Sequence, residues 1–365
     1  MSGATTPVML VLLGGFGIAF VFGVVANRSN FCIMGSVSDV VNMHHWGRMR
    51  MWMLAVAVAV LGTGVLHSSG QIDIAQSVYQ RPLVPWLSLL LGGAVFGVGM
   101  TLSGGCPNKN LVRLGAGSVR SLVVLVFLAI ASYMTLKGLL AQWRVSFLDP
   151  MVIDLTLLGQ PSLPAVLGKL TGLAAPAAAG VGAALVSLAL LVFVFRNREF
   201  RADTGSIWAG ILLGLLVVAA WYLTGHLGFG ENPQTLENVY FATNSRTLES
   251  LSFVAPLAYS LEMLMLWTDK SLRLTFGIMS VLGVACGSLA AALVWRQFRW
   301  EGFASLQDLR NNLVGAVLMG FGGVTAMGCT IGQGLSGLST LAIGSCITVA
   351  GIVGGCALTI KWLQR

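Results

Sequence analysis

The sequence predicts an all-α polytopic membrane protein, because its composition is too apolar for a water-facing surface and its apolar stretches are long and continuous. Of its 365 residues, 56% are hydrophobic and only 9% are charged, and the mean hydropathy is +0.84. Soluble domains carry about 25% charged residues. A helix that crosses a bilayer needs roughly 20 apolar residues and hydrogen-bonds its backbone internally. The alternating pattern of a transmembrane β-barrel is not what these stretches show.

Nine apolar stretches are long enough to cross a membrane. The expected spans are 7–26, 51–67, 86–102, 118–140, 176–195, 206–224, 273–295, 312–327 and 338–361. The first has no basic segment before it, so we interpret it as a span and not as a cleavable signal peptide. A further apolar stretch, 251–267, is short and contains Pro256 and Glu262.

Basic residues in the short loops indicate the topology. They follow the first, third, fifth and seventh spans, as Arg28, Arg48, Arg50, Lys109, Arg113, Arg120, Arg196, Arg198, Arg201, Arg296, Arg299 and Arg310. If 251–267 is a short or re-entrant helix, all of these clusters lie on the cytoplasmic side. We therefore expect an external N-terminus, a cytoplasmic C-terminus and external loops at 141–175 and 225–250. The net charge of +8 is then a topology and lipid signal, so we expect no nucleic-acid partner.

Two glycine-cysteine segments indicate an internal repeat. Gly97, Gly99, Gly105 and Cys106 match Gly320, Gly322, Gly328 and Cys329 at one constant offset of 223 residues. Within a single membrane domain, 1–365, this predicts a first repeat unit at 7–140, a linker span at 176–195 and a second unit at 206–361. A linker of one span inverts the second unit relative to the first, as in many transporters.

Each of these segments offers an anion-binding feature. Gly104-Gly105-Cys106-Pro107-Asn108 predicts a helix that ends at glycine and restarts at proline, with free N–H groups at the break. Such N–H groups suit an anion. The segment from Gly328 to Gln333 offers the same feature from the opposite side. A cysteine thiol there is a soft, weak donor that suits a sulfur atom.

A purely structural role competes with this interpretation. Cysteine also behaves as a small hydrophobic residue, and glycines commonly pack membrane helices. The matched positions of Cys106 and Cys329 favour a functional role for these two. Cys286, Cys346 and Cys356 lie within apolar spans without a break, and for them we expect only packing.

The segment from Asn27 to Cys32 follows the first span and continues into a predicted short helix. Arg28 is a candidate pathway residue, although its simplest role is a cytoplasmic anchor. His44 and His45 lie beside Trp46 without further ligands at suitable spacing, so we expect no metal site. No nucleotide-binding or catalytic-triad motif is present, and we expect no cofactor.

The residues around Cys32, Cys106 and Cys329 resemble the YeeE/YedE sulfur-transport family over most of the chain. The resemblance implies that these three cysteines line a pathway and that short helices dip inward from both faces. It also implies uptake of thiosulfate or a related reduced-sulfur anion, in some relatives beside a TusA-like cytoplasmic sulfurtransferase. Met327, in place of the glycine found at Gly104, departs from the first repeat.

The combined hypothesis is a non-enzymatic importer in the bacterial plasma (inner) membrane. Its pathway would be formed by two inverted half-helix segments and lined by Cys32, Cys106, Cys329, Gly105, Gly328, Asn108, Gln333 and Arg28. One alternative is a membrane-embedded sulfurtransferase in which Cys106 or Cys329 forms a persulfide. Another is a structural membrane subunit whose glycines only pack helices.

Overall fold

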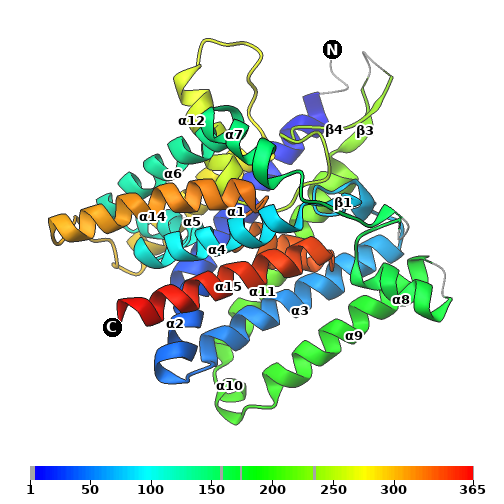
Figure 1. The fold of residues 1–365 in the computed structure, drawn as a ribbon, viewed down its shortest axis with the longest axis horizontal. Coiled ribbons are helices and arrows are strands. Elements are labelled where there is room, and N and C mark those ends of the chain that lie inside the picture. The colour runs from blue at the N-terminus through cyan, green and yellow to red at the C-terminus, as the bar shows by residue number, and fades with distance from the viewer. Residues whose placement is uncertain (1–4, 157–158, 173–174, 233–235, 365) are drawn as a thin grey trace.

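The computed structural model describes residues 5–156, 159–172, 175–232 and 236–364, and it is dominated by helices (Figure 1). The α-helices are α1 (Thr5–Ser29), α2 (Ile33–Met43), α3 (Gly47–Ser68), α4 (Trp86–Leu102), α5 (Pro107–Gly115), α6 (Val119–Lys137), α7 (Leu139–Trp143), α8 (Leu163–Thr171), α9 (Ala175–Phe195), α10 (Arg198–Ala202), α11 (Thr204–Tyr222), α12 (Val254–Met265), α13 (Phe276–Val294), α14 (Leu306–Thr325) and α15 (Ile343–Leu363). A 3-10 turn, η1 (Ile74–Gln76), and three π-helical turns, η2 (Arg144–Leu148), η4 (Leu223–Leu227) and η5 (Gly332–Gly337), lie between them. The strands form two antiparallel pairs, β1 (Leu83–Val84) with β2 (Ile153–Asp154) and β3 (Phe229–Glu231) with β4 (Asn238–Tyr240).

Every stretch that we expected to span the membrane is a helix in the structure. Among the described residues, eight helices are long and apolar enough to cross a bilayer. The ninth expected span lies in α14, a helix of 20 residues whose first two turns are polar. The ambiguous stretch forms α12, which has 12 residues. At 1.5 Å per residue it is about 18 Å long, too short for a hydrocarbon core of about 30 Å.

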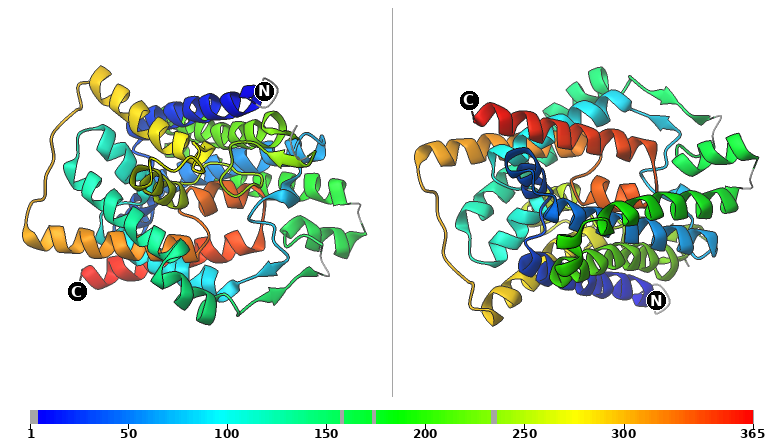
Figure 2. Two further views of the ribbon diagram at one scale, coloured as in Figure 1. Left: turned by 90° about the horizontal axis from the view of Figure 1, so that it is seen from above. Right: turned by 90° about the horizontal axis from the view of Figure 1, so that it is seen from below.

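The connecting segments gather at two opposite ends of the molecule. At one end, β1 pairs with β2, Ser77 bridges to Leu248, and the amide of Leu163 bonds the carbonyl of Leu341. At the other end, Ser118 bridges to Glu301. Figure 2 shows α1 starting at the first end and α15 finishing at the second. Each of these contacts joins two segments that the nine-span topology places on the same side of the membrane. We refer to the two ends as the predicted outer and inner ends.

The centre of the fold is an antiparallel pair of helices, α4 and α14, which lie side by side in Figure 1. A Cβ atom on Gly99 would lie 2.7 Å from the carbonyl oxygen of Gly315, and one on Gly322 would lie 2.6 Å from that of Gly92. Gly92 and Gly315 are equivalent under the 223-residue offset, as are Gly99 and Gly322. Each equivalent residue therefore makes the same contact in the opposite direction, which is the pattern of a two-fold axis between the helices.

The surrounding helices follow the same pattern. The contact of α4 with α15 is matched by α14 with α6, and that of α1 with α13 by α11 with α3. Likewise α2 packs on α15 as α12 packs on α6. Helices of the N-terminal half thus pack on helices of the C-terminal half, and the small residues at these contacts allow close backbone approach. Helix α9 packs on α3 and α8, outside this pattern.

Candidate functional site

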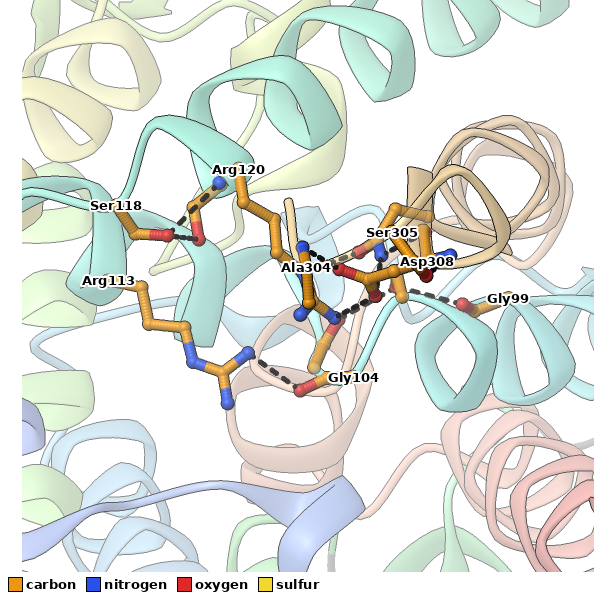
Figure 3. Close-up of polar contacts among 12 residues, drawn as sticks. Gly99, Gly104, Arg113, Ser118, Arg120, Ala304, Ser305 and Asp308 are labelled. Carbon is orange, nitrogen blue, oxygen red and sulfur yellow. Dashed lines mark hydrogen bonds and ion pairs between the residues drawn. The ribbon is translucent and has the colours of Figure 1, made fainter. Parts of the chain in front are cut away.

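The first break in the helices has the predicted form. Helix α4 ends at Leu102, and Gly104 turns the chain in a left-handed conformation with φ of 67°. Cys106 is the N-cap of α5 and Pro107 follows in its first turn. The carbonyl of Gly104 accepts a hydrogen bond of 3.0 Å from the guanidinium of Arg113 (Figure 3). The sequence therefore predicted both the end and the restart of the helix.

The second break differs from the expected half-helix. Met327, the counterpart of Gly104, also adopts a left-handed conformation, with φ of 56°. The chain then passes Cys329 and forms only the six-residue π-turn η5 before α15 begins. Glycines at 332, 334 and 337 explain this, because glycine is a poor helix former. The second break therefore starts a short π-helical segment instead of a regular α-helix, with the amide of Gly332 directed at the Cys329 sulfur.

Cys32 and Cys329 share one local geometry. Cys32 is the N-cap of α2, and its sulfur accepts a hydrogen bond of 3.5 Å from the amide of Gly35. The sulfur of Cys329 accepts a hydrogen bond of 3.4 Å from the amide of Gly332. Both side chains are buried. In each case the thiol lies at the start of a turn whose backbone N–H groups face it.

The structure brings the three cysteines into one row. The thiol of Cys106 lies within interaction range of Cys32 and of the hydroxyl of Thr330. Thr330 directly follows Cys329 in the chain, and Cys329 lies near Tyr79 at the predicted outer end. The order from the outer end is thus Cys329, Thr330, Cys106 and Cys32.

Two buried polar side chains beside this row have unused hydrogen-bonding capacity. Neither the amide nitrogen nor the amide oxygen of Asn108 has a partner, and the hydroxyl of Thr330 has none besides its weak contact with the thiol of Cys106. Both residues are only 1% exposed. An unpaired buried polar group costs roughly 1–3 kcal/mol, so such groups are uncommon outside binding sites. Sequence reasoning identified Asn108 but missed Thr330, whose only signal was its place beside Cys329.

The remaining predicted pathway residues have structural contacts. Gln333 donates to the carbonyl of Ala326 at 2.8 Å and accepts from Ser345 at 2.7 Å. A Cβ atom on Gly105 would meet the Lys109 side chain, and one on Gly328 would meet that of Gln333. Arg28 is exposed, and its guanidinium lies 5.5 Å from the ring centroid of Trp295.

Cations surround the inner pair, Cys32 and Cys106. Lys109, Arg113 and Arg48 all lie near Cys32. Lys109 donates a hydrogen bond of 3.0 Å to Asn30, while Arg48 forms an ion pair with Asp39.

A neighbouring arginine on α6 is fully engaged in the fold. Arg120 lies 3.2 Å from the carboxylate of Asp308 (Figure 3). It also donates a hydrogen bond of 3.1 Å to the amide oxygen of Asn312. Its charge therefore fastens α6 to α14.

The other three cysteines lie within helices. Cys286 is exposed and Cys346 is half-buried. Cys356 is buried, and its sulfur accepts a hydrogen bond of 3.2 Å from the hydroxyl of Thr101. None of the three lies at a helix break.

Comparisons with known proteins identify the family and similar proteins. A family model described as "Sulphur transport" matches residues 28–358. A protein of Escherichia coli strain K12 named thiosulfate transporter TsuA is 26% identical over 343 residues, covering 89% of this chain and 87% of its own length. A protein of the same name from Spirochaeta thermophila is 24% identical over 346 residues, covering 91% and 92%.

Proposed function

Because the chain belongs to the sulphur transport family, we propose that it carries thiosulfate, or a related reduced-sulfur anion, across the bacterial inner membrane into the cytoplasm. Both similar proteins are named as thiosulfate transporters, and each is covered over most of its length. The multi-pass helical fold and the lipid bilayer that it requires suit this role.

The observation that carries the proposal is the row of buried thiols with unpartnered polar groups beside it. A dianion that leaves water for a low-dielectric interior needs replacement donors, since its desolvation costs many kcal/mol. The thiols of Cys329, Cys106 and Cys32 are weak donors, and Asn108 and Thr330 supply stronger ones. A series of weak binding contacts favours passage of the anion, because a single tight binding site would retain it.

The pathway roles follow from the contacts. We assign Cys32, Cys106, Cys329 and Asn108 to the lining. Gly105 and Gly328 leave room beside the thiols for the side chains of Lys109 and Gln333.

Two of the sequence candidates act from outside the lining. Gln333 supports the second break through its hydrogen bonds, and Arg28 anchors α1 at the interface by its contact with Trp295.

The repeat units are part of the proposal. We infer that 7–140 and 206–361 are two inverted units joined by the span at 176–195. The two-fold contacts of α4, α14, α6 and α15 support this division.

A cytoplasmic recipient completes the scheme. The family resemblance supports a TusA-like sulfurtransferase at the inner end. Addition of such a protein inside the vesicles should then accelerate net uptake, and no acceleration would argue against it.

Uptake of labelled thiosulfate into proteoliposomes tests the proposed function. We expect saturable uptake that unlabelled thiosulfate abolishes, with sulfate, sulfite and selenium analogues as competitors. Vesicles that accumulate no more label than protein-free vesicles would overturn the proposal. Mass spectrometry of the protein after exposure tests the alternative enzyme, because a lasting sulfur adduct on Cys106 or Cys329 would indicate a sulfurtransferase.

A further inference from the structure

Two cavities lie at the predicted outer end, next to the second break. Their volumes are 290 and 270 Å³. They share the lining residues Val78, Tyr79, Arg81, Arg144 and Met327. One cavity reaches Gln333 and the other reaches Gly328, which lie on either side of Cys329 in the chain. The shared wall therefore lies at the outer end of the cysteine row.

Arg144 lines both cavities, and its ion pair with Asp149 leaves its Nε without a hydrogen bond. It begins η2, its side chain is only 19% exposed, and its buried Nε has no hydrogen-bond partner. The nearest carboxylate oxygen, on Asp149, is 3.6 Å away, beyond hydrogen-bonding range. Asp149 is held in this place by Ser88, whose hydroxyl donates to it at 2.8 Å. The carboxylate thus orients the guanidinium without saturating it.

The charge of both cavities is positive. Each is lined by Arg81 and Arg144 and by one carboxylate, Asp149 in the first and Glu249 in the second. Glu249 is already engaged, because it accepts hydrogen bonds from the amide and the hydroxyl of Ser245 at 2.7 and 2.5 Å. A positively lined cleft with apolar walls concentrates anions and raises their rate of entry.

We propose that Arg81 and Arg144 form an outer capture site for a divalent sulfur oxyanion, which binds there before it reaches Cys329. This inference rests on the proposed function. Guanidinium groups match planar pairs of oxygen atoms, whereas the thiols beyond match a sulfur atom. The capture site binds the oxygen atoms of the anion and responds to its double charge, and the cysteine row contacts its terminal sulfur atom. Sulfate, which has only oxygens to present, therefore occupies the capture site as a competitor.

Uptake kinetics in proteoliposomes separate this site from the pathway. Arg144→Gln and Arg81→Gln should each raise the KM for thiosulfate by about tenfold, with the maximal rate largely kept. The KM of Arg144→Lys should lie between those of Arg144→Gln and the wild type, since lysine keeps the positive charge but cannot donate two parallel hydrogen bonds as a guanidinium does. The increase in KM should shrink at high ionic strength.

Asp149→Asn should have the opposite effect and lower the KM. The asparagine oxygen can still accept the bond from Ser88, while the competing charge is gone.

Arg246→Gln is the matched control, because it removes the same charge from an outer-loop position that lines a different cavity and neither of these two. It should leave the KM unchanged. Arg81 is exposed, so its variant gives a reading even if Arg144→Gln fails to fold. Wild-type KM values in folded Arg81→Gln and Arg144→Gln would overturn the capture site while wild-type uptake leaves the proposed function standing. Absence of uptake by the wild type would instead overturn the proposed function itself, and the capture site with it.

Discussion

The two helix breaks occupy equivalent places in the repeat, yet they are built differently. The first has a left-handed glycine, a nine-residue helix and the unpartnered Asn108, and cations surround the inner cysteine pair. The second has the left-handed Met327, a π-turn and the fully bonded Gln333, and it adjoins the outer cavities. The helices around the breaks keep the two-fold contacts. The helix scaffold therefore keeps two-fold contacts, while the two breaks that it holds differ in backbone form and in the charges beside them.

The contact between the central helices α4 and α14 should lose similar stability when either side is crowded by an added methyl group. Gly99→Ala and Gly322→Ala each place a methyl group against the backbone of the opposite central helix, at 2.7 and 2.5 Å. Overpacking of this kind costs about 1–3 kcal/mol, so both variants should lose several degrees of thermal stability in detergent, by similar amounts. Gly354→Ala, where no atom lies within 4 Å, should match the wild type. A large drop in only one of the pair would break the two-fold account.

The two breaks should respond differently to loss of an amide. Asn108→Ala removes an unpartnered group, so stability should be unchanged or raised, while thiosulfate uptake falls about tenfold. Gln333→Ala leaves the Ala326 carbonyl and the Ser345 hydroxyl without their partner, and should cost about 1–3 kcal/mol of stability. Thermal unfolding and uptake measured on the same preparations check both. Equal loss of stability in the two variants would contradict the assignment of Asn108 to the path.

The smallest expected difference concerns two equivalent carboxylates. Asp39 and Glu262, related by the same 223-residue offset, pair with Arg48 and Lys137. Glu262→Gln should cost at most about 1 kcal/mol, because Lys137 is 54% exposed. Asp39→Asn should cost more, since two guanidinium nitrogens bind Asp39. Thermal unfolding of both variants tests the order, and a larger loss for Glu262→Gln would reverse it.

Much of the fold was predictable because lipid imposes a strong rule on sequence. All nine apolar stretches are helices, and the re-entrant interpretation of 251–267 agrees with the short α12. The break at Cys106 was predictable because glycine and proline have fixed backbone preferences. The break at Cys329 was predicted as well, but the π-helical form of the segment after it was not, because that form depends on how Gly332 and its neighbours pack against other segments, including Ser252, as well as on the glycines themselves.

The site was only partly predictable. Matched spacing identified Cys106 and Cys329, but Cys32 entered mainly through the family resemblance, and the structure places it beside Cys106. Thr330 and Arg144 could not be found from local pattern, because their importance arises from contacts between distant segments. Arg28 shows the converse: a charge next to a motif was a candidate, and its observed contact is with Trp295.

The central claim is that the row of thiols carries the anion. Labelled thiosulfate uptake into proteoliposomes by Cys106→Ser and Cys329→Ala, with Cys356→Ala as the buried control outside the row, tests it most directly. The account predicts a loss of about tenfold or more in both row variants, on the scale of one hydrogen bond to a charged group, and wild-type uptake in the control. Wild-type rates in both Cys106→Ser and Cys329→Ala would contradict it.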